Sequence, residues 1–402
     1  MKIKVLHILN RLIIGGPSVI AIDIIENLPS KYEAKLIVGE KEEGEEYGDF
    51  LIKDNHAIIV DIPHMRRSLN PFQDLKAYLA IKKVIKEFKP DIVHTHASKA
   101  GAIGRMAAVS CKTPIVIHTF HGHVFHSYFN KTITKLFILI ERFLAKKSTK
   151  IVSISQSQKE DLVNKYNICK EDKVALIPNG INLEKFEDTQ LSKRQAWRKK
   201  YHFSDDMILV GIVGRMAPVK NHTMFIHVAS HFHNNPNFKN VKFIIIGDGG
   251  TRLDIQSQLE RLGVSYVYLP DNLVAPEPTV IFTSWETDMD KAYAGLDIVC
   301  LTSLNEGSPI TLIEAQAAKK PIISTNVGGV ADTVKENHSA YLIESNDIKT
   351  FVSQLEYLIK HPDVRKEMGE NGFNFVKENF NQAKLLKGYD QLYTDLLLAS
   401  PQ

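Results

Sequence analysis

The strongest constraint on the fold is that short apolar runs alternate with longer stretches of helical periodicity, and that this series occurs twice. Runs rich in β-branched residues occupy residues 4–9, 34–38, 58–61, 92–94, 115–119 and 151–154. A second series occupies residues 208–213, 241–246, 266–269, 298–301, 321–324 and 340–343. Strands that alternate with helices form a parallel sheet with both faces covered. The 402 residues therefore predict an α/β chain of two doubly wound, Rossmann-like domains that face each other across a cleft.

The domain limits follow from turns and charged runs. We expect a first domain over residues 1–190 and a second over residues 205–375, with the boundary within 182–205. The apolar positions of residues 376–402 recur at helical spacing and predict a C-terminal helix, which can pack on either domain. We expect this helix to join the first domain. Ligands of parallel sheets bind beyond the carboxyl ends of the strands, so the chemistry is expected in the cleft.

Composition excludes several classes of protein. The net charge of +4 is small, and we expect no nucleic-acid partner. Cys111, Cys169 and Cys300 are far apart, which argues against a disulfide framework and fits a reducing compartment. No uncharged apolar stretch approaches the roughly 20 residues of a membrane span. We therefore expect a cytoplasmic protein.

The segment 301–330 carries the most chemical information. It predicts a strand, a short loop and a helix that begins near Ile310. The N–H groups and dipole of a helix N-terminus favour a phosphate group. Glu306 lies in the loop, and Glu314 lies one turn into the helix, where it can accept hydrogen bonds from sugar hydroxyls. The alternative is that these carboxylates merely favour the helix dipole.

A second candidate segment is 211–220, in which a strand ends in glycine and a loop carries two cations. Arg215 offers a planar fork of donors and Lys220 a point charge, and together they suit a diphosphate. Cations of this kind stabilise the negative charge that develops on a departing diphosphate. The alternative is a pair of solvated surface charges.

Together these segments resemble the donor site of glycosyltransferase family 4, whose members have the two-domain GT-B fold. The residues that carry the resemblance are Arg215, Lys220, Glu306, Glu314 and the Asn-Val-Gly-Gly sequence at 326–329. Further support comes from IIIGDGG at 244–250, IPNGIN at 177–182 and the Gly pair at 15–16. The resemblance extends from the first strand to the last helix and is most specific over 297–330.

The resemblance implies a role for each of these residues. Arg215 and Lys220 would hold the diphosphate, Glu314 would bind the ribose hydroxyls, and Glu306 would contact the transferred sugar. The resemblance adds donor contacts at Gly15, Gly16, Gly214, Gly307, Ser308, Pro309 and Ile310.

Histidines concentrate at the end of the fifth apolar run and just after it, at positions 118, 121, 123 and 126. With His94 and His96 they raise the alternative of a metal site, but no carboxylate or thiolate cluster completes one. The resemblance implies that a histidine at the end of this strand contacts the donor sugar, and we assign this role to His121. His118 is expected to be structural. Whether His123 contacts the acceptor is left open.

Two further features bear on cofactors and on the donor. Asp288-Met289-Asp290 resembles a manganese-binding motif, but it precedes a predicted helix and is better explained as a helix cap. We expect no metal and no cofactor. Residues 270–278 depart from the compact loop of the family, which leaves the base open between uridine and guanosine, with uridine favoured.

The implied activity is that of a retaining hexosyltransferase that moves a sugar from a nucleotide diphosphate to an acceptor glycan. Relatives imply a polyprenyl-linked acceptor in surface-polysaccharide, lipopolysaccharide or O-antigen synthesis. The alternatives are a transferase with a soluble acceptor, a nucleotide-sugar 2-epimerase, or a non-catalytic protein that binds sugar nucleotides.

Residues 131–150 predict a basic amphipathic helix, which can lie on an anionic membrane surface. The alternative is a domain helix that buries one face and leaves its lysines in solvent. We expect peripheral contact with the inner face of the cell membrane through this helix.

Overall fold

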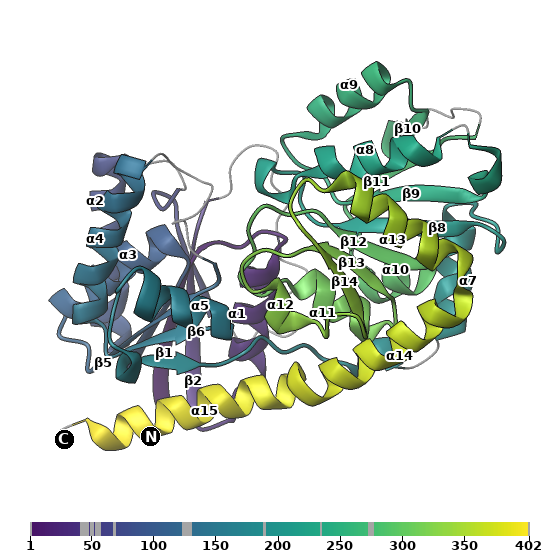
Figure 1. Ribbon diagram of the computed structural model, residues 1–402. Coiled ribbons are helices and arrows are strands. Elements are labelled where there is room, and N and C mark those ends of the chain that lie inside the picture. The colour runs from purple at the N-terminus through teal and green to yellow at the C-terminus, as the bar shows by residue number, and fades with distance from the viewer. Residues whose placement is uncertain are drawn as a thin grey trace. The chain divides into compact units, whose positions relative to one another are not determined.

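The computed structural model describes residues 2–40, 48, 52, 58–66, 70–122, 131–187, 190–233, 235–271 and 277–400. The chain divides into two compact units (Figure 1). The first unit comprises Met1–Gly180 together with Gln382–Gln402, and the second comprises Ile181–Asn381. Among the described helices, none combines the length and the apolar character that a membrane crossing requires.

Within the described residues, the first unit contains a seven-stranded parallel sheet in the order β3-β2-β1-β4-β5-β6-β7. Its strands are β1 (Ile3–Arg11), β2 (Tyr32–Gly39), β3 (Ile58–Ile62), β4 (Ile92–His96), β5 (Ile115–Phe120), β6 (Lys150–Ser153) and β7 (Val174–Leu176). Its longer helices are α1 (Gly16–Asn27), α2 (Pro71–Phe88), α3 (Ser98–Ser110), α4 (Lys131–Lys147) and α15 (Gln382–Ala399), with a short α5 (Gln156–Glu160). The near-continuous burial of β1, β4 and β5 is typical of parallel strands covered on both faces.

The second unit repeats this architecture, with strand order β10-β11-β9-β8-β12-β13-β14 among the described residues. Its strands are β8 (Ile208–Val213), β9 (Val241–Ile246), β10 (Tyr266–Tyr268), β11 (Val280–Ser284), β12 (Ile298–Leu301), β13 (Ile322–Thr325) and β14 (Ala340–Ile343). Its helices are α6 (Glu184–Glu187), α7 (Gln190–Lys200), α8 (His222–Phe232), α9 (Arg252–Leu262), α10 (Met289–Gly295), α11 (Ile310–Ala317), α12 (Val330–Thr333), α13 (Ile348–Lys360) and α14 (Pro362–Asn379). The prediction of two doubly wound parallel sheets is confirmed, although β7 and β11 were not among the predicted strands.

The segment between the sheets folds with the second unit, because charged groups and a tryptophan attach α7 to α10. Trp197 is buried, and a Cβ on Gly295 would lie 2.2 Å from its ring. Arg194 and Arg198 donate to the two oxygens of Asp297, at 2.8 and 2.7 Å. The division of the chain thus falls at Gly180, just upstream of α6 and α7.

The C-terminal helix α15 packs on the first unit through polar as well as apolar contacts. Tyr393 and Tyr389 are buried, and their hydroxyls lie 2.6 Å from His94 Nδ1 and 3.2 Å from Thr119 Oγ1. Tyr32 donates to Asp390 at 2.7 Å. The helix before it, α14, packs against α11 within the second unit.

Candidate functional site

Two loops of the second unit carry most of the predicted donor residues, and backbone contacts hold them at the carboxyl ends of the central strands. Gly214 follows β8 and donates to Ile246 O at 2.9 Å. Gly247 has a φ of +129°, and a Cβ there would lie 2.2 Å from Gly214 O. The turns after β8 and β9 can approach this closely only because position 247 has no side chain.

The loop after β8 places Lys220 against the loop after β12. Lys220 Nζ donates to Glu306 Oε1 at 2.6 Å, and the hydroxyl of Ser303 donates to the same oxygen at 2.6 Å. The side chains of Lys220 and Glu306 are 23% and 11% exposed, so water screens their attraction only in part. Two residues that lie far apart in the sequence therefore form one charged pair at the predicted diphosphate position.

The backbone at Glu306 is held by the glycine sequence that the resemblance singled out. Gly329 N donates to Glu306 O at 3.1 Å. Gly328 has a φ of +53°, and a Cβ there would lie 2.0 Å from the same carbonyl oxygen. The glycine at 328 is thus explained by its positive φ and by the approach of its backbone to Glu306.

Residues 307–310 lead from this loop into α11, which begins at Ile310. Pro309 occupies the N-cap position, and no side chain in the described part of the chain caps the first turn. An uncapped first turn presents backbone N–H groups and the positive end of the helix dipole to an anion. The predicted residues Gly307, Ser308, Pro309 and Ile310 therefore lie where a phosphate can be bound.

Glu314 lies one turn into α11 and is part-buried. Loss of hydration raises the pKa of its carboxyl group to about 7, while the Tyr293 hydroxyl and the Lys185 ammonium oppose this shift. A carboxyl group that titrates near neutral pH is typical of functional sites. Glu314 can therefore accept hydrogen bonds, and these bonds become stronger as the carboxyl group ionises near neutral pH.

Arg215 lies beside a network that sequence reasoning did not assign. The neighbouring Met216 N donates to Asp248 O at 2.8 Å. The carboxylate of Asp248 accepts from Gly249 N at 2.7 Å, from Arg252 at 3.1 Å and from Tyr268 at 2.8 Å. Asp248 therefore supports the loop that carries Arg215. The sequence signal that could have identified Asp248 is its place in the Gly-Asp-Gly-Gly turn.

The first unit carries Gly15, Gly16 and His121. Gly15 occupies the N-cap position of α1 and Gly16 is the first residue of that helix, and Gly15 O accepts from Ser18 N at 3.1 Å. His121 follows β5, and its Nε2 lies 2.9 Å from His96 Nδ1. These three residues belong to one unit, and the other predicted donor residues belong to the second.

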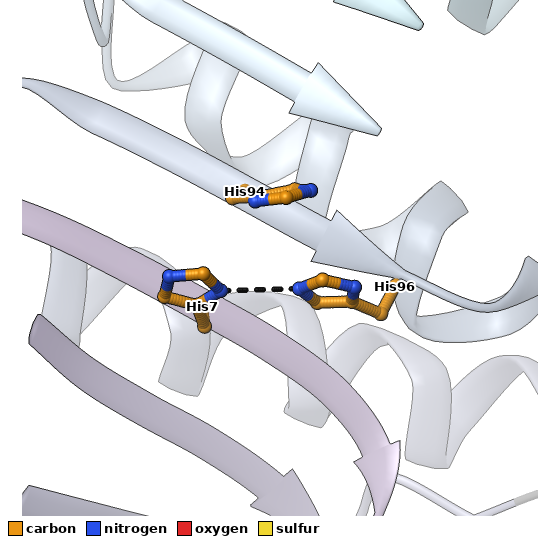
Figure 2. Close-up of side chains that lie close together, drawn as sticks. All are labelled: His7, His94 and His96. Atoms are coloured by element: carbon orange, nitrogen blue, oxygen red, sulfur yellow. Dashed lines mark hydrogen bonds between the residues drawn. The ribbon is translucent and has the colours of Figure 1, made fainter. Parts of the chain in front are cut away.

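A buried histidine cluster backs His121, and one member, His7, was missed from the sequence. His7 Nδ1 lies 3.1 Å from His96 Nε2, and the ring of His94 lies beside both (Figure 2). Burial lowers the pKa of His7 to about 3 and that of His121 to about 4. Burial likewise holds the pKa of His94 and His96 well below the usual range. The cluster is therefore neutral at physiological pH.

The two candidate metal sites differ in the chemistry that they offer. One nitrogen from each of His7, His94 and His96 lies within 4.8 Å of the others, and this is the group in the described residues that has the chemistry of a metal site. Asp288 and Asp290 instead pair with Lys291 at 2.7 Å and Lys193 at 3.0 Å. Asp288 occupies the N-cap position of α10, but its side chain makes no cap hydrogen bond, so the expected capping role is wrong.

Helix α4 exposes apolar side chains as well as lysines. Leu136, Leu139 and Phe143 are 57%, 59% and 55% exposed, while Leu144 and Ala145 are buried against the unit. Helix α4 therefore buries one face and leaves its lysines in solvent, as the domain-helix alternative expects, but it also exposes these three apolar side chains. On the first unit, α3 contacts both α2 and α4 (Figure 1), and α2 exposes Phe72, Leu75 and Leu79.

Parts of three sequence-based hypotheses lie outside the described residues. His123 and His126 fall in this category, as do residues 272–276 of the loop that was expected to bear on the base.

Comparison with known proteins adds independent information. The model described as Glycosyltransferase Family 4 matches residues 14–185, and the one described as Glycosyl transferases group 1 matches residues 193–375. An Escherichia coli UDP-Gal:alpha-D-GlcNAc-diphosphoundecaprenol alpha-1,3-galactosyltransferase is 30% identical over 399 residues, which cover 99% of this chain and 98% of the relative. The capsular polysaccharide biosynthesis glycosyltransferase CapM of Staphylococcus aureus is 29% identical over 346 residues, or 85% and 86% of the two chains.

Solved structures share the fold at lower identity. Anabaena Alr3699/HepE in complex with UDP and glucose matches with a TM-score of 0.81 and 16% identity, covering 98% of this chain and 99% of the other. Sucrose-phosphate synthase from Thermosynechococcus elongatus matches with a TM-score of 0.82 and 17% identity, covering 99% and 100%.

Proposed function

Since the chain belongs to glycosyltransferase family 4, we propose that it moves a hexose from a uridine diphosphate sugar to a polyprenyl-linked glycan, with retention of configuration. The GT-B fold, the membership of this family and the glycosyltransferase activity that the sequence predicted are confirmed. The donor base, the sugar, the acceptor and the residues that bind them are the content of the proposal.

The observation that carries the donor assignment is the Lys220–Glu306 pair beside the uncapped start of α11. Lys220 and the N–H groups of the first helical turn would bind the diphosphate, with Arg215 as a second cation. Glu306 would contact the transferred sugar, and Glu314 would accept from the ribose hydroxyls. The HepE complex contains UDP, and the E. coli relative is named for a UDP-sugar donor, which supports uridine as the base.

In the reaction that fits these residues, the protein stabilises the negative charge of the leaving diphosphate and supplies no covalent nucleophile. The bond between the anomeric carbon and the diphosphate oxygen breaks, and a bond to the acceptor oxygen forms on the same face. The acceptor proton passes to the departing phosphate. Lys220 and Arg215 would stabilise the negative charge of that leaving group, and we expect no metal cofactor to be required.

The acceptor proposal rests on relatives and on one surface. The E. coli relative acts on a diphosphoundecaprenol-linked sugar, according to its name. On α4, the exposed Leu136, Leu139 and Phe143 lie among exposed Lys135, Lys146 and Lys147. Apolar side chains surrounded by lysines suit an anionic lipid surface. We propose that α4 makes peripheral contact with the membrane that holds the acceptor, on its cytoplasmic side.

The donor assignment is tested by ligand-induced stabilisation in the presence of a chelator. Saturating UDP, at about 100 times its Kd, should stabilise the wild type by about 2.7 kcal/mol. Lys220→Ala and Glu314→Ala should lose most of this effect, while Lys239→Ala, at an exposed position of the same unit, should keep it. Equal stabilisation of all variants would contradict the site, and stabilisation by GDP alone would correct the base.

The membrane proposal is tested by flotation with vesicles that contain anionic lipid. A Leu136→Ser, Leu139→Ser, Phe143→Ser variant should float less than the wild type, because apolar area is lost from the contact. A variant with Leu191→Ser and Leu253→Ser provides a matched control, since these leucines are also highly exposed but lie on the second unit. If the α4 variant floats like the wild type, the membrane contact is wrong, and the donor assignment is unaffected.

A further inference from the structure

We propose that His7 and His96 are positioning residues, which hold His121 as a neutral imidazole with its proton on Nδ1. His121 would then serve the transferred sugar as a hydrogen-bond donor and would be unable to act as a general base. The inference rests on the proposed function and on the role that the family resemblance implies for His121, which is contact with the donor sugar. It extends that function by assigning His7 and His96 and by specifying the protonation state of the ring.

The arrangement follows from the register of three adjacent parallel strands. His7 on β1 pairs with His94 on β4, and His96 on β4 pairs with Thr119 on β5. His121 follows the last residue of β5. Parallel strands bring their carboxyl ends to one edge of the sheet, so residues near the ends of β1, β4 and β5 meet there.

The three rings form a linear chain of contacts. His7 Nδ1 lies 3.1 Å from His96 Nε2 (Figure 2), and His96 Nδ1 lies 2.9 Å from His121 Nε2. Each contact joins two ring nitrogens at hydrogen-bonding distance, so each needs one proton between its partners. A neutral imidazole carries a single N–H, so the middle ring donates in one contact and accepts in the other. Both hydrogen bonds must therefore run in the same direction along the row of rings.

Only two assignments meet this requirement. In the first, His7 Nδ1–H donates to His96, and His96 Nδ1–H donates to His121 Nε2, so that His121 carries its proton on Nδ1. In the second, His121 Nε2–H donates to His96, and His96 Nε2–H donates to His7 Nδ1. The second assignment places the remaining proton of the chain on His7 Nε2.

The surroundings of His7 favour the first assignment. His7 is fully buried, and its Nε2 has no hydrogen-bond partner among the described residues. In the second assignment this atom would be a buried N–H without an acceptor, which is rare in folded proteins. In the first it is a lone pair without a donor, and we take this as the less costly state by analogy with the backbone, where orphaned N–H groups are rarer than under-satisfied acceptors. The proton of His121 is therefore placed on Nδ1.

The charge state of His7, His96 and His121 agrees with this assignment. Burial keeps the pKa of all three rings below physiological pH. Among the described residues, His94 from β4 lies beside His7 and His96, and His118 from β5 is close enough to lower the pKa of His96. Tyr389 and Tyr393 from α15 contact His94. With Nδ1 protonated and Nε2 occupied by His96, His121 has no lone pair for the acceptor's proton, which leaves the departing phosphate to take it.

A metal ion at this cluster is the competing explanation. The nitrogens of His7, His94 and His96 are close enough, but both nitrogens of His94 already contact hydroxyl groups, at 2.6 Å to Tyr393 and 2.7 Å to Thr119. The described partners of these rings are neutral, so a buried divalent ion would have no compensating charge here. Proton sharing explains both short nitrogen–nitrogen distances without this cost.

The test is a long-range proton–nitrogen correlation spectrum of the full chain labelled with ¹⁵N-histidine. His121→Asn identifies the signals of His121. We expect a neutral Nδ1–H ring between pH 6 and 8, in the presence and in the absence of UDP. A neutral Nε2–H ring or an imidazolium at pH 7 would overturn the proposal. Zinc that stays bound at one equivalent after dialysis, and that is lost in His7→Asn, would overturn it in favour of the metal site.

Variants give a second readout. His96→Leu removes the donor to His121 Nε2 and should lower kcat roughly 10- to 100-fold, by analogy with the loss of a partner that orients a metal-ligating histidine. His96→Asn retains an N–H donor and should recover most of that loss. The hydroxyl of Tyr393 contacts His94 and does not contact His7, His96 or His121. Tyr393→Phe should therefore leave the His121 tautomer unchanged. A His96→Leu variant whose kcat and His121 tautomer both match the wild type would contradict the proposal.

The two proposals fail in different ways. If UDP does not bind or no sugar is transferred, the proposed function fails, although the spectrum of His121 still reports its tautomer. If UDP binds and transfer proceeds while His121 carries its proton on Nε2, the tautomer proposal alone fails.

Discussion

Lys220 and Glu306 form a part-buried ion pair of 2.6 Å between two loops of the second unit. In the proposed donor site, the diphosphate competes with Glu306 for the Lys220 ammonium. Lys220→Ala should therefore weaken UDP binding and lower kcat/KM by about 100-fold or more. Glu306→Gln should bind UDP at least as tightly as the wild type but lower kcat. Calorimetric titration with UDP and steady-state kinetics test this, and equal weakening of UDP binding by both changes would contradict it.

The carboxyl group of Glu314 should make donor binding depend on pH near neutrality. Its pKa is raised to about 7, chiefly by loss of hydration, so the group becomes ionised as the pH rises from 6 to 8. The ionised carboxylate accepts hydrogen bonds from ribose hydroxyls better than the protonated form. UDP affinity should rise over this interval, and Glu314→Gln should lose the part of the rise that this group provides. Glu344→Gln, at an exposed position, is the control.

The same group gives a prediction for the ligand-free protein, with the opposite sign. Its pKa in the folded state lies above the ordinary value of 4.5, so its contribution to stability is complete below pH 4.5. That contribution is lost as the pH rises through about 7. Between pH 5 and pH 8, the Tm of the wild type should therefore fall more than the Tm of Glu314→Gln. Parallel curves for the two proteins would show that the carboxyl group is hydrated in the free state.

Most of the fold could be predicted because parallel strands that are buried on both faces appear in the sequence as apolar runs. The two strands that were missed show the limits of this signal. β7 (Val174–Leu176) has three residues and Leu176 is exposed, so its run is too short to stand out. β11 (Val280–Ser284) follows the proline-containing segment 270–278, which reads as a loop, although the strand lies between β10 and β9.

The site was predictable where function concentrates in one segment, and unpredictable where it depends on register. Glu306, Ile310 and Glu314 share one loop and helix, so their proximity follows from local structure. His7 is a single histidine in an apolar strand, and nothing near it in the sequence indicates a partner. Its relation to His96 appears only when β1 pairs with β4. The same holds for Lys220 and Glu306, which meet because β8 lies beside β12.

Asp297 should be essential for the attachment of α7 to the second unit. Its carboxylate accepts from Arg198, whose side chain is 2% exposed, and from the backbone of Leu209 at 2.8 Å. Asp297→Ala leaves the buried guanidinium without its anion and should destabilise the unit by about 3–5 kcal/mol. Arg194→Ala removes the more exposed partner and should cost about 1 kcal/mol or less. Urea unfolding measures both, and a similar small loss in the two variants would contradict the ranking.

The hydroxyl of Tyr393 should contribute more to stability than that of Tyr32, although both tyrosines connect α15 to the first unit. Tyr393 lies 2.6 Å from His94 Nδ1 in a buried environment, and Tyr393→Phe leaves that nitrogen without a partner. The expected loss is about 1–3 kcal/mol. Tyr32 donates to Asp390, which is part-exposed, so water can replace the hydroxyl in Tyr32→Phe and the loss should be smaller. Urea unfolding of the two variants decides between a specific buried contact and a general apolar attachment of α15, since the latter predicts equal and small effects.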